Sequence, residues 1–290
     1  MSTPIFKNDV AKGRMMDWYG RFLGRIKKPS KSLVVRTSLG ESHVLFVGDP
    51  ANPPVVCLHA MLTSSAHLLS ELCELANDFY LIAPDLPGQS AKGLNVRLPY
   101  SDNSHSNWLG EVLDGLNLEQ VHLLGVSLGG FVARQYAAQN PEKVVSLTLI
   151  VPAGIVQGSL LKGFSKMAWP MIRYKMRQNE KNLYALVDNL VTTRDEEWAQ
   201  YIGDSFMDFN PNLKIPPLAT DQDLEKLTMP VLLIGAEHDI SFPGQALIDR
   251  LQGVVPNLET ELIIGGKHSP PTTSEFRSWL HERFTKFVKT

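Results

Sequence analysis

The sequence has little cysteine and no excess of charge. Its two cysteines, Cys57 and Cys73, stand in apolar segments with neither metal-ligand spacing nor a disulfide framework, so we expect both to be buried thiols. The 28 basic and 30 acidic residues leave a formal charge of -2, so the molecule carries no strong field that would collect nucleic acid. The composition therefore argues against a disulfide scaffold and against a nucleic-acid binder.

Long apolar runs, internal repeats and low-complexity tracts are also missing. No apolar stretch is long enough to span a bilayer, and the first residues lack the charged and then apolar layout of a secretory signal, so we expect a cytoplasmic protein without an integral membrane segment. Near the N-terminus, Met15, Trp18 and Phe22 fall at helical spacing among basic residues. This pattern predicts a terminal helix docked on its own domain, with weak contact to a membrane surface as the alternative.

The chain from residue 33 onward alternates strand-like and helix-like segments. This alternation predicts an α/β fold with a mostly parallel, eight-stranded sheet flanked by helices, which begins with a hairpin over 34–37 and 43–48. Continuous apolar runs are typical of buried parallel strands. Such strands are expected over 54–58, 79–83, 120–124, 144–151, 230–235 and 259–264, with helices over 64–76, 104–116, 128–139, 244–251 and 273–288.

Residues 155–225 interrupt this rhythm with apolar residues at helical spacing. We therefore expect a core formed by 1–154 and 226–290, and a helical cap, or lid, over 155–225. Large apolar side chains of the cap could line an apolar pocket or only pack the cap on the core, and both interpretations stay open. These side chains are Met167, Trp169, Met171, Tyr174 and Met176.

The pentapeptide Gly125-Val126-Ser127-Leu128-Gly129 follows an apolar strand and begins a helix. A serine on so sharp a turn, a nucleophile elbow, needs small residues two positions to either side, because side chains there would strike the neighbouring chain. The glycines fit neither a dinucleotide-binding fingerprint nor a phosphate loop. Ser127 is therefore a candidate nucleophile, although glycine and serine are common enough that the pentapeptide alone is weak evidence.

A serine hydroxyl is a weak nucleophile near neutral pH and needs a base, which a third group must orient. Two later loops, each directly after an apolar strand, supply candidates: His268 as the base and Asp239 as the acid. Glu237, in the same loop, is the alternative acid, and His238 is expected to be a loop residue. No group of His, Asp and Glu has metal-ligand spacing, so no metal ion is expected.

In this order the sites resemble the α/β-hydrolase superfamily, and most of all small bacterial carboxylesterases with a helical cap. The resemblance extends over nearly the whole chain and implies a serine hydrolase with a catalytic triad of Ser127, Asp239 and His268 and no cofactor. The segments that carry it are His59-Ala60-Met61-Leu62, Asp85-Leu86-Pro87-Gly88-Gln89-Ser90, Gly125 to Gly130, Asp239 and His268.

The resemblance also implies an oxyanion hole formed by two backbone N–H groups, those of Met61 and Leu128. The family usually has glycine where this chain has Ala60, a difference that bears on the Met61 amide and not on the reaction class, since the donor is main-chain. His59 and Asp85 resemble residues that brace the neighbouring loops. The remaining histidines show no partner pattern; His43, His67, His105 and His281 are expected at the surface or as caps, and His122 in a strand.

The expected activity is hydrolysis of small to medium apolar esters, small-molecule substrates, through an acyl-enzyme on Ser127. A serine at this position argues against dehalogenase and epoxide-hydrolase chemistry, which would suggest an aspartate. Thioesterase, lactonase, amidase and carbon–carbon bond hydrolase activities use the same triad and stay open, as does a ligand-binding receptor on the same fold. The sequence does not indicate the natural substrate or the oligomeric state.

Overall fold

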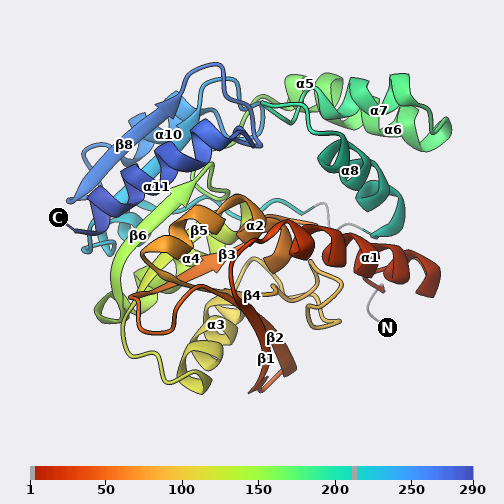
Figure 1. The fold of residues 1–290 in the computed structure, drawn as a ribbon. Helices are drawn as coiled ribbons and strands as arrows, with labels where there is room; N and C mark the ends of the chain where they lie inside the picture. Colours follow the sequence, from red (N-terminus) through yellow and green to blue (C-terminus); the bar gives the residue numbers. More distant parts are fainter. Residues whose placement is uncertain (1–3, 211–213, 290) are drawn as a thin grey trace.

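The computed structural model describes residues 4–210 and 214–289. At its centre is one eight-stranded sheet with the order β1-β2-β4-β3-β5-β6-β7-β8, in which β1, β2 and β4 pair antiparallel and the remaining neighbours pair parallel (Figure 1). The predicted mostly parallel sheet is confirmed. Its strands are β1 (Ser30–Thr37), β2 (Gly40–Val47), β3 (Pro54–Leu58), β4 (Tyr80–Pro84), β5 (Val121–Val126), β6 (Val144–Ile150), β7 (Val231–Ala236) and β8 (Leu258–Ile263).

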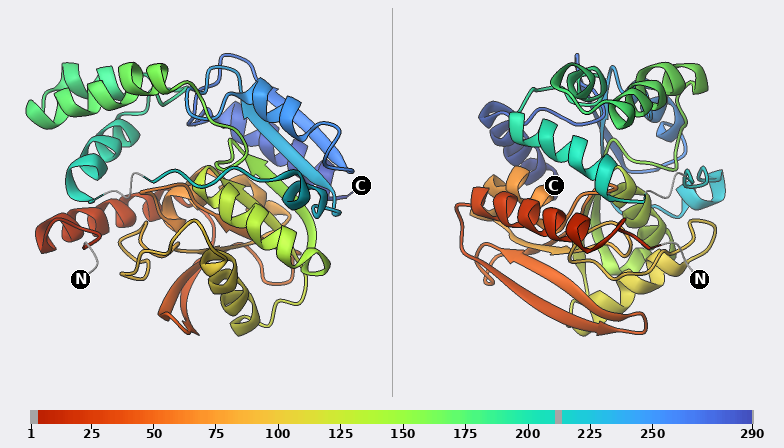
Figure 2. Two further views of the ribbon diagram at one scale, coloured as in Figure 1. Left: turned by 180° about the vertical axis from the view of Figure 1, so that it is seen from behind. Right: turned by 90° about the vertical axis from the view of Figure 1, so that its right-hand side faces the viewer.

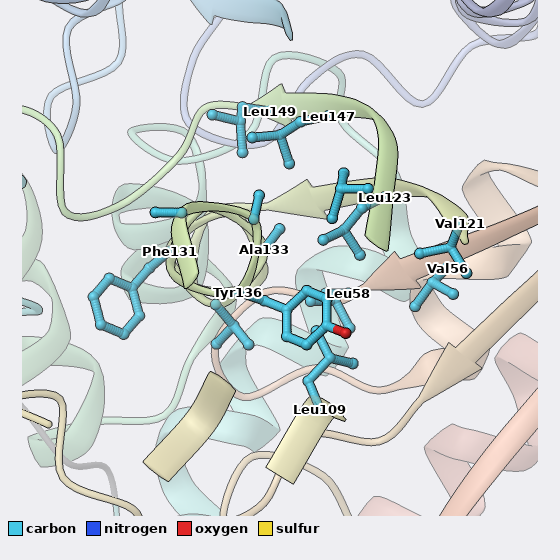
Figure 3. Close-up of a cluster of buried hydrophobic side chains, with 14 of the residues drawn as sticks. Val56, Leu58, Leu109, Val121, Leu123, Phe131, Ala133, Tyr136, Leu147 and Leu149 are labelled. Carbon is cyan, nitrogen blue, oxygen red and sulfur yellow. The ribbon is translucent and has the colours of Figure 1, made fainter. Parts of the chain in front are cut away.

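Helices cover both faces of the sheet, because alternate residues of its central strands point to opposite sides. Leu123 of β5 belongs to the apolar cluster under α3, α4 and α10, whereas Leu124 belongs to the cluster under α1, α2 and α11. Figure 3 shows the first cluster, with Tyr136 of α4 directed toward the strands. These helices are α1 (Asp9–Arg25), α2 (Ser65–Glu71), α3 (Ser104–Gly115), α4 (Leu128–Gln139), α10 (Gly244–Leu251) and α11 (Ser274–Val288).

Most predicted strands and helices of the core agree with the structure to within two residues, but the opening hairpin and the helix over 64–76 differ by more. The hairpin register pairs Thr37 with Gly40, so its turn is tighter than expected, and β1 begins earlier, at Ser30. The helix expected over 64–76 is divided into α2 and a 3-10 turn over Cys73–Asn77. The chain tightens there because the Leu75 N–H donates to a carbonyl three residues back, which buries Leu75 against the sheet.

The elements that the structure describes between β6 and β7 are all helices, as predicted. Figures 1 and 2 show α5, α6 and α7 as an arm that extends away from the sheet, and α8 returning toward α1. The end of the segment differs from the expected boundary at 225, since Leu224 of α9 is buried against α4 in the core cluster. The elements are α5 (Leu160–Gly163), a π-helical turn η3 (Phe164–Ala168), α6 (Trp169–Met176), α7 (Glu180–Val187), α8 (Glu196–Asp208) and α9 (Asp221–Glu225).

The N-terminal helix α1 docks on its own molecule. Trp18 and Phe22 are buried against α2 and α8, and the Arg25 guanidinium binds the carboxylates of Asp195 and Glu197 at the start of α8. The aromatic face that membrane contact by this segment would use is therefore inside the protein. Within the described ranges, no helix is both long enough and apolar enough to cross a membrane.

Main-chain segments approach one another very closely at the turn from β5 into α4, which carries Ser127. Ser127 has φ 52° and ψ -112°, outside the regions that side-chain-bearing residues favour, and its N–H donates to the Ile150 carbonyl at 3.0 Å. A Cβ on Gly125 would lie 2.4 Å from the carbonyl oxygen of Gly129, and a Cβ on Gly129 would lie 2.1 Å from that of Leu58. Backbone crowding thus explains the small residues on both sides of Ser127.

The substitution Gly129→Ala tests this constraint. The added methyl group collides with the Leu58 carbonyl, which is main-chain and held by the sheet, so we expect the free energy of unfolding to fall by about 3 kcal/mol. The measurement is urea denaturation followed by tryptophan fluorescence. Gly163→Ala in α5 is the control, since nothing lies within 4 Å of its added methyl; an equal loss in both variants would contradict the explanation.

Candidate active site

Ser127 and its two predicted partners lie together at one edge of the sheet. The Ser127 Oγ is 3.0 Å from Nε2 of His268, and Nδ1 of His268 is 2.8 Å from Oδ2 of Asp239. The three residues follow β5, β8 and β7 in turn. Because parallel strands end at the same edge of a sheet, residues far apart in the chain converge there. The result is a continuous hydrogen-bonded path from hydroxyl to imidazole to carboxylate.

Asp239, and not Glu237, contacts the imidazole. The Asp239 side chain is buried, and its Oδ1 accepts the Ser241 N–H at 2.7 Å, which leaves Oδ2 for His268. Glu237 instead accepts the Gly265 N–H at 2.8 Å on the exposed side of the same loop. The geometry therefore favours Asp239 as the orienting acid.

The groups around His268 shift the pKa of its imidazole. Burial lowers the pKa of its imidazole, but the negative charge of Asp239 and the hydrogen bond to it outweigh burial, so the pKa lies above its ordinary value. The ring edge also packs against Phe242, with 5.4 Å between centroids. Asp239 thus stabilises the imidazolium that forms when His268 accepts a proton, which is what a general base needs.

Two backbone N–H groups near Ser127 are available as donors. In the described part of the chain, neither the Leu128 N–H, first in α4, nor the Met61 N–H has a hydrogen-bond partner. The adjacent Leu62 N–H does have one, since it donates to the Gln89 side chain at 3.3 Å. These two free N–H groups are the ones that the resemblance predicts for an oxyanion hole. Leu128 stands at the start of α4, where the partial positive charge of the helix favours a negatively charged group. Their shared role stays a prediction.

A buried polar cluster holds the loop that carries Met61. His59 bonds through Nδ1 to the Ala60 carbonyl at 2.8 Å and accepts the Leu86 N–H on Nε2 at 2.9 Å. Burial lowers the pKa of His59 despite the nearby charge of Asp85, so the ring is neutral with its proton on Nδ1. Asp85 also accepts hydrogen bonds from Ser65 and pairs with His43. These contacts agree with the bracing roles expected of His59 and Asp85.

An apolar cavity of about 140 Å³ begins at Ser127 and His268 and extends between α2, α11 and the segment that leads into α8. The residues that line this cavity were not predicted from the sequence. The large side chains proposed for a pocket do not reach the cavity: Tyr174 packs inside the cap, and Trp169 is half exposed. The residues that line it include Leu68, Leu72, Val191, Trp198, Phe276 and Leu280.

His67 also lines this cavity, although the sequence analysis expected it at the surface or as a cap. It is buried with its ring against Phe22 and Tyr201, and among the described residues its Nε2 has no hydrogen-bond partner. Burial holds the pKa of His67 well below its ordinary value. His43 and His105 are buried as well. A lone histidine in a sequence gives no sign of such burial, because the aromatic rings around His67 come from distant helices.

Comparison with known proteins agrees with this geometry. The profile of the alpha/beta hydrolase fold family matches residues 53–182. An uncharacterized carboxylesterase of Bacillus subtilis is 25% identical over 273 residues, which are 89% of this chain and 86% of that protein. Carboxylesterase YbfK of the same organism is 26% identical over 249 residues, 82% of each chain. The crystal structure of naproxen esterase from Bacillus subtilis has a TM-score of 0.81 at 23% identity and covers 94% of this chain and 96% of its own.

The strand order, the turn that carries Ser127 and these likenesses lead to one assignment. The solved esterase structure is similar along 94% of this chain with a TM-score of 0.81, which shows a common fold. The profile match includes the loop after β3, the turn after β5 and the helical segment from α5 into α7. The chain has the α/β-hydrolase fold.

Proposed function

We propose that the protein is a carboxylesterase-type serine hydrolase that cleaves small to medium apolar esters through an acyl-enzyme on Ser127. The observation that carries the proposal is the hydrogen-bonded path from Ser127 through His268 to Asp239 at the mouth of an apolar cavity. The names of the two Bacillus relatives, both carboxylesterases, support an ester as the substrate.

The proposed reaction is two-step acyl transfer. Ser127 Oγ attacks the ester carbonyl while His268 Nε2 takes its proton, and the N–H groups of Met61 and Leu128 bind the oxyanion. The tetrahedral intermediate collapses as His268 gives the proton to the leaving alcohol. Water then attacks the acyl-enzyme by the same route and releases the acid and the free serine. Every proton in the cycle passes through His268. Asp239 takes no proton itself, and acts by holding the imidazole ring in place and by stabilising its charged form.

We further propose that the helical segment after β6 acts as a cap that completes the substrate site. Val191, Thr193 and Trp198 of this segment line the cavity opposite Leu68 and other residues of the core. A substrate in the cavity would therefore be enclosed by both parts, and its size would be limited by their separation. The cytoplasmic location stays a prediction from the sequence.

Ser127→Ala is expected to abolish labelling by a fluorophosphonate probe and to lower kcat on a nitrophenyl butyrate ester by about 10⁴-fold or more, since no other group supplies the nucleophile. The measurements are gel fluorescence of the labelled protein and initial rates. Ser106→Ala, which changes a buried serine of α3 away from the hydrogen-bonded path, is the control. Wild-type protein that neither reacts with the probe nor hydrolyses esters, thioesters or lactones, yet binds a small ligand tightly, would contradict the proposal and favour a receptor.

Asp239→Asn is expected to lower the pKa of His268, because burial then acts without the opposing negative charge. In the wild type, activity should fall as the pH drops through that raised pKa, since a protonated His268 cannot take the proton of Ser127. NMR titration of the imidazole ring protons measures the shift, and turnover should fall by about 10⁴-fold. Glu237→Gln is the matched control; a larger effect from that variant would identify Glu237 as the acid instead.

Leu72→Phe is expected to narrow the cavity while leaving the triad intact. The ratio of kcat/KM for hexanoate to kcat/KM for acetate esters should fall by about tenfold, because the longer acyl group loses the space that the ring occupies. Leu113→Phe, a buried leucine on the other face of the sheet, controls for overpacking as such. An unchanged ratio in a protein of normal melting temperature would mean that the acyl group binds elsewhere.

A further inference from the structure

The outer face of the arm formed by α5, η3 and α6 exposes large apolar side chains to solvent. Leu161 is 84% exposed, Met176 81% and Trp169 50%. Soluble surfaces usually carry such side chains singly, and a contiguous group of them marks an interaction site. The full set, which we call the arm face, is Leu160, Leu161, Phe164, Trp169, Ile172 and Met176.

The exposed apolar residues of α6 lie on a different face of the helix from its buried residues. At about 100° per residue, Trp169, Ile172 and Met176 fall within an arc of about 60°. Pro170 and Tyr174, the buried residues of α6, lie on the opposite side, where Tyr174 packs against α7 and α8. The helix thus has two apolar faces, and only the inner one is used in the fold.

The charged residues of α5, η3 and α6 are all basic. From residue 158 to residue 179 the sequence has no Asp or Glu, although the whole chain carries a formal charge of -2. The cations of this stretch form no ion pair with any residue in the described parts of the chain; one of them, Arg173, bonds to the neutral amide of Asn182. They are Lys162, Lys166, Arg173, Lys175 and Arg177.

We propose that the arm face docks on an anionic lipid bilayer surface. An apolar stripe with a tryptophan, flanked by unpaired Lys and Arg, is complementary to a layer that is apolar inside and negative at its surface. A second copy of the chain is a poorer fit, because a two-fold contact through this face would set cations against cations. The projecting position of the arm in Figures 1 and 2 leaves this face open to a flat partner.

This docking differs from the membrane contact considered for the N-terminal segment. The aromatic residues of α1 are buried, and Arg25 is paired with carboxylates of α8, so the structure assigns the lipid-facing role to a different helix. The proposed contact leaves Ser127 and the cavity lining untouched, because no residue of the arm face lines that cavity. Docking and ester hydrolysis can therefore be tested separately.

The test is flotation of the full-length protein with vesicles of phosphatidylcholine alone or mixed with phosphatidylglycerol. We expect binding to the mixed vesicles that weakens as salt is added. The pair Lys162→Gln and Lys166→Gln should lower the partition coefficient by about thirtyfold, since each basic residue near such a surface contributes roughly 1 kcal/mol. The pair Leu161→Ser and Trp169→Ser should also lower the partition coefficient, because it removes apolar area that the bilayer would bury. Val34→Ser, an exposed apolar residue of β1, is the control and should bind as the wild type does.

All variants should hydrolyse a short, water-soluble ester at the wild-type rate, which shows that they are folded. The proposal is overturned if the wild type floats with neither kind of vesicle, or if it binds both kinds equally. It is also overturned if light scattering shows a dimer that the Leu161 and Trp169 substitutions convert to monomer without any effect on vesicles, because the face would then join two copies of the chain.

Discussion

The closeness of α4 to the end of β3 is the constraint on which the active site depends. Gly129 approaches the Leu58 carbonyl so closely that no side chain fits between them. This approach turns the chain sharply at Ser127 and sets the start of α4 beside the loop that carries Met61. Ser127, the N-terminus of α4 and this loop are therefore positioned by main-chain contacts, which are stiffer than contacts between side chains.

Two histidines beside buried aspartates show how the same residue types acquire different roles. His268 contacts Asp239 directly and stands next to a hydroxyl, and the pKa of its ring is raised. His59 is 3.7 Å from Asp85 and accepts a backbone N–H on its second nitrogen, and the pKa of its ring is lowered by burial. A ring that must accept an N–H stays neutral and braces a loop, whereas a ring stabilised in its charged form can carry a proton.

Much of the fold and of the candidate site could be predicted because local sequence specifies them. Buried parallel strands are apolar throughout, and the glycines around Ser127 mark a turn whose chemistry is local. Chain order then indicated Asp239 and His268, which the structure brings together with Ser127. Asp239 was preferred over Glu237 because of the resemblance to the family, and the direction of each side chain supports that preference, since Asp239 contacts His268 whereas Glu237 accepts the Gly265 N–H.

The cavity lining could not be predicted in this way. His67 and Trp198 are distant in sequence, and their burial results from the docking of α1 and α8 around them. The helical period of the cap correctly indicated helices, but a period states only that apolar residues share a face and not what that face contacts. Trp169 was expected to line a pocket or pack on the core, and it does neither.

The two faces of α6 explain that outcome. Tyr174 on the inner side provides the packing that holds the cap together, so the fold does not require Trp169, Ile172 or Met176 on the outer side. Exposed apolar side chains favour aggregation, and polar residues at those positions would keep the helix equally well. Lysines and arginines along the same stretch, with no acid among them, oppose self-association while favouring a negative partner. The composition of the arm is thus better explained by what it contacts outside the protein than by the stability of the cap.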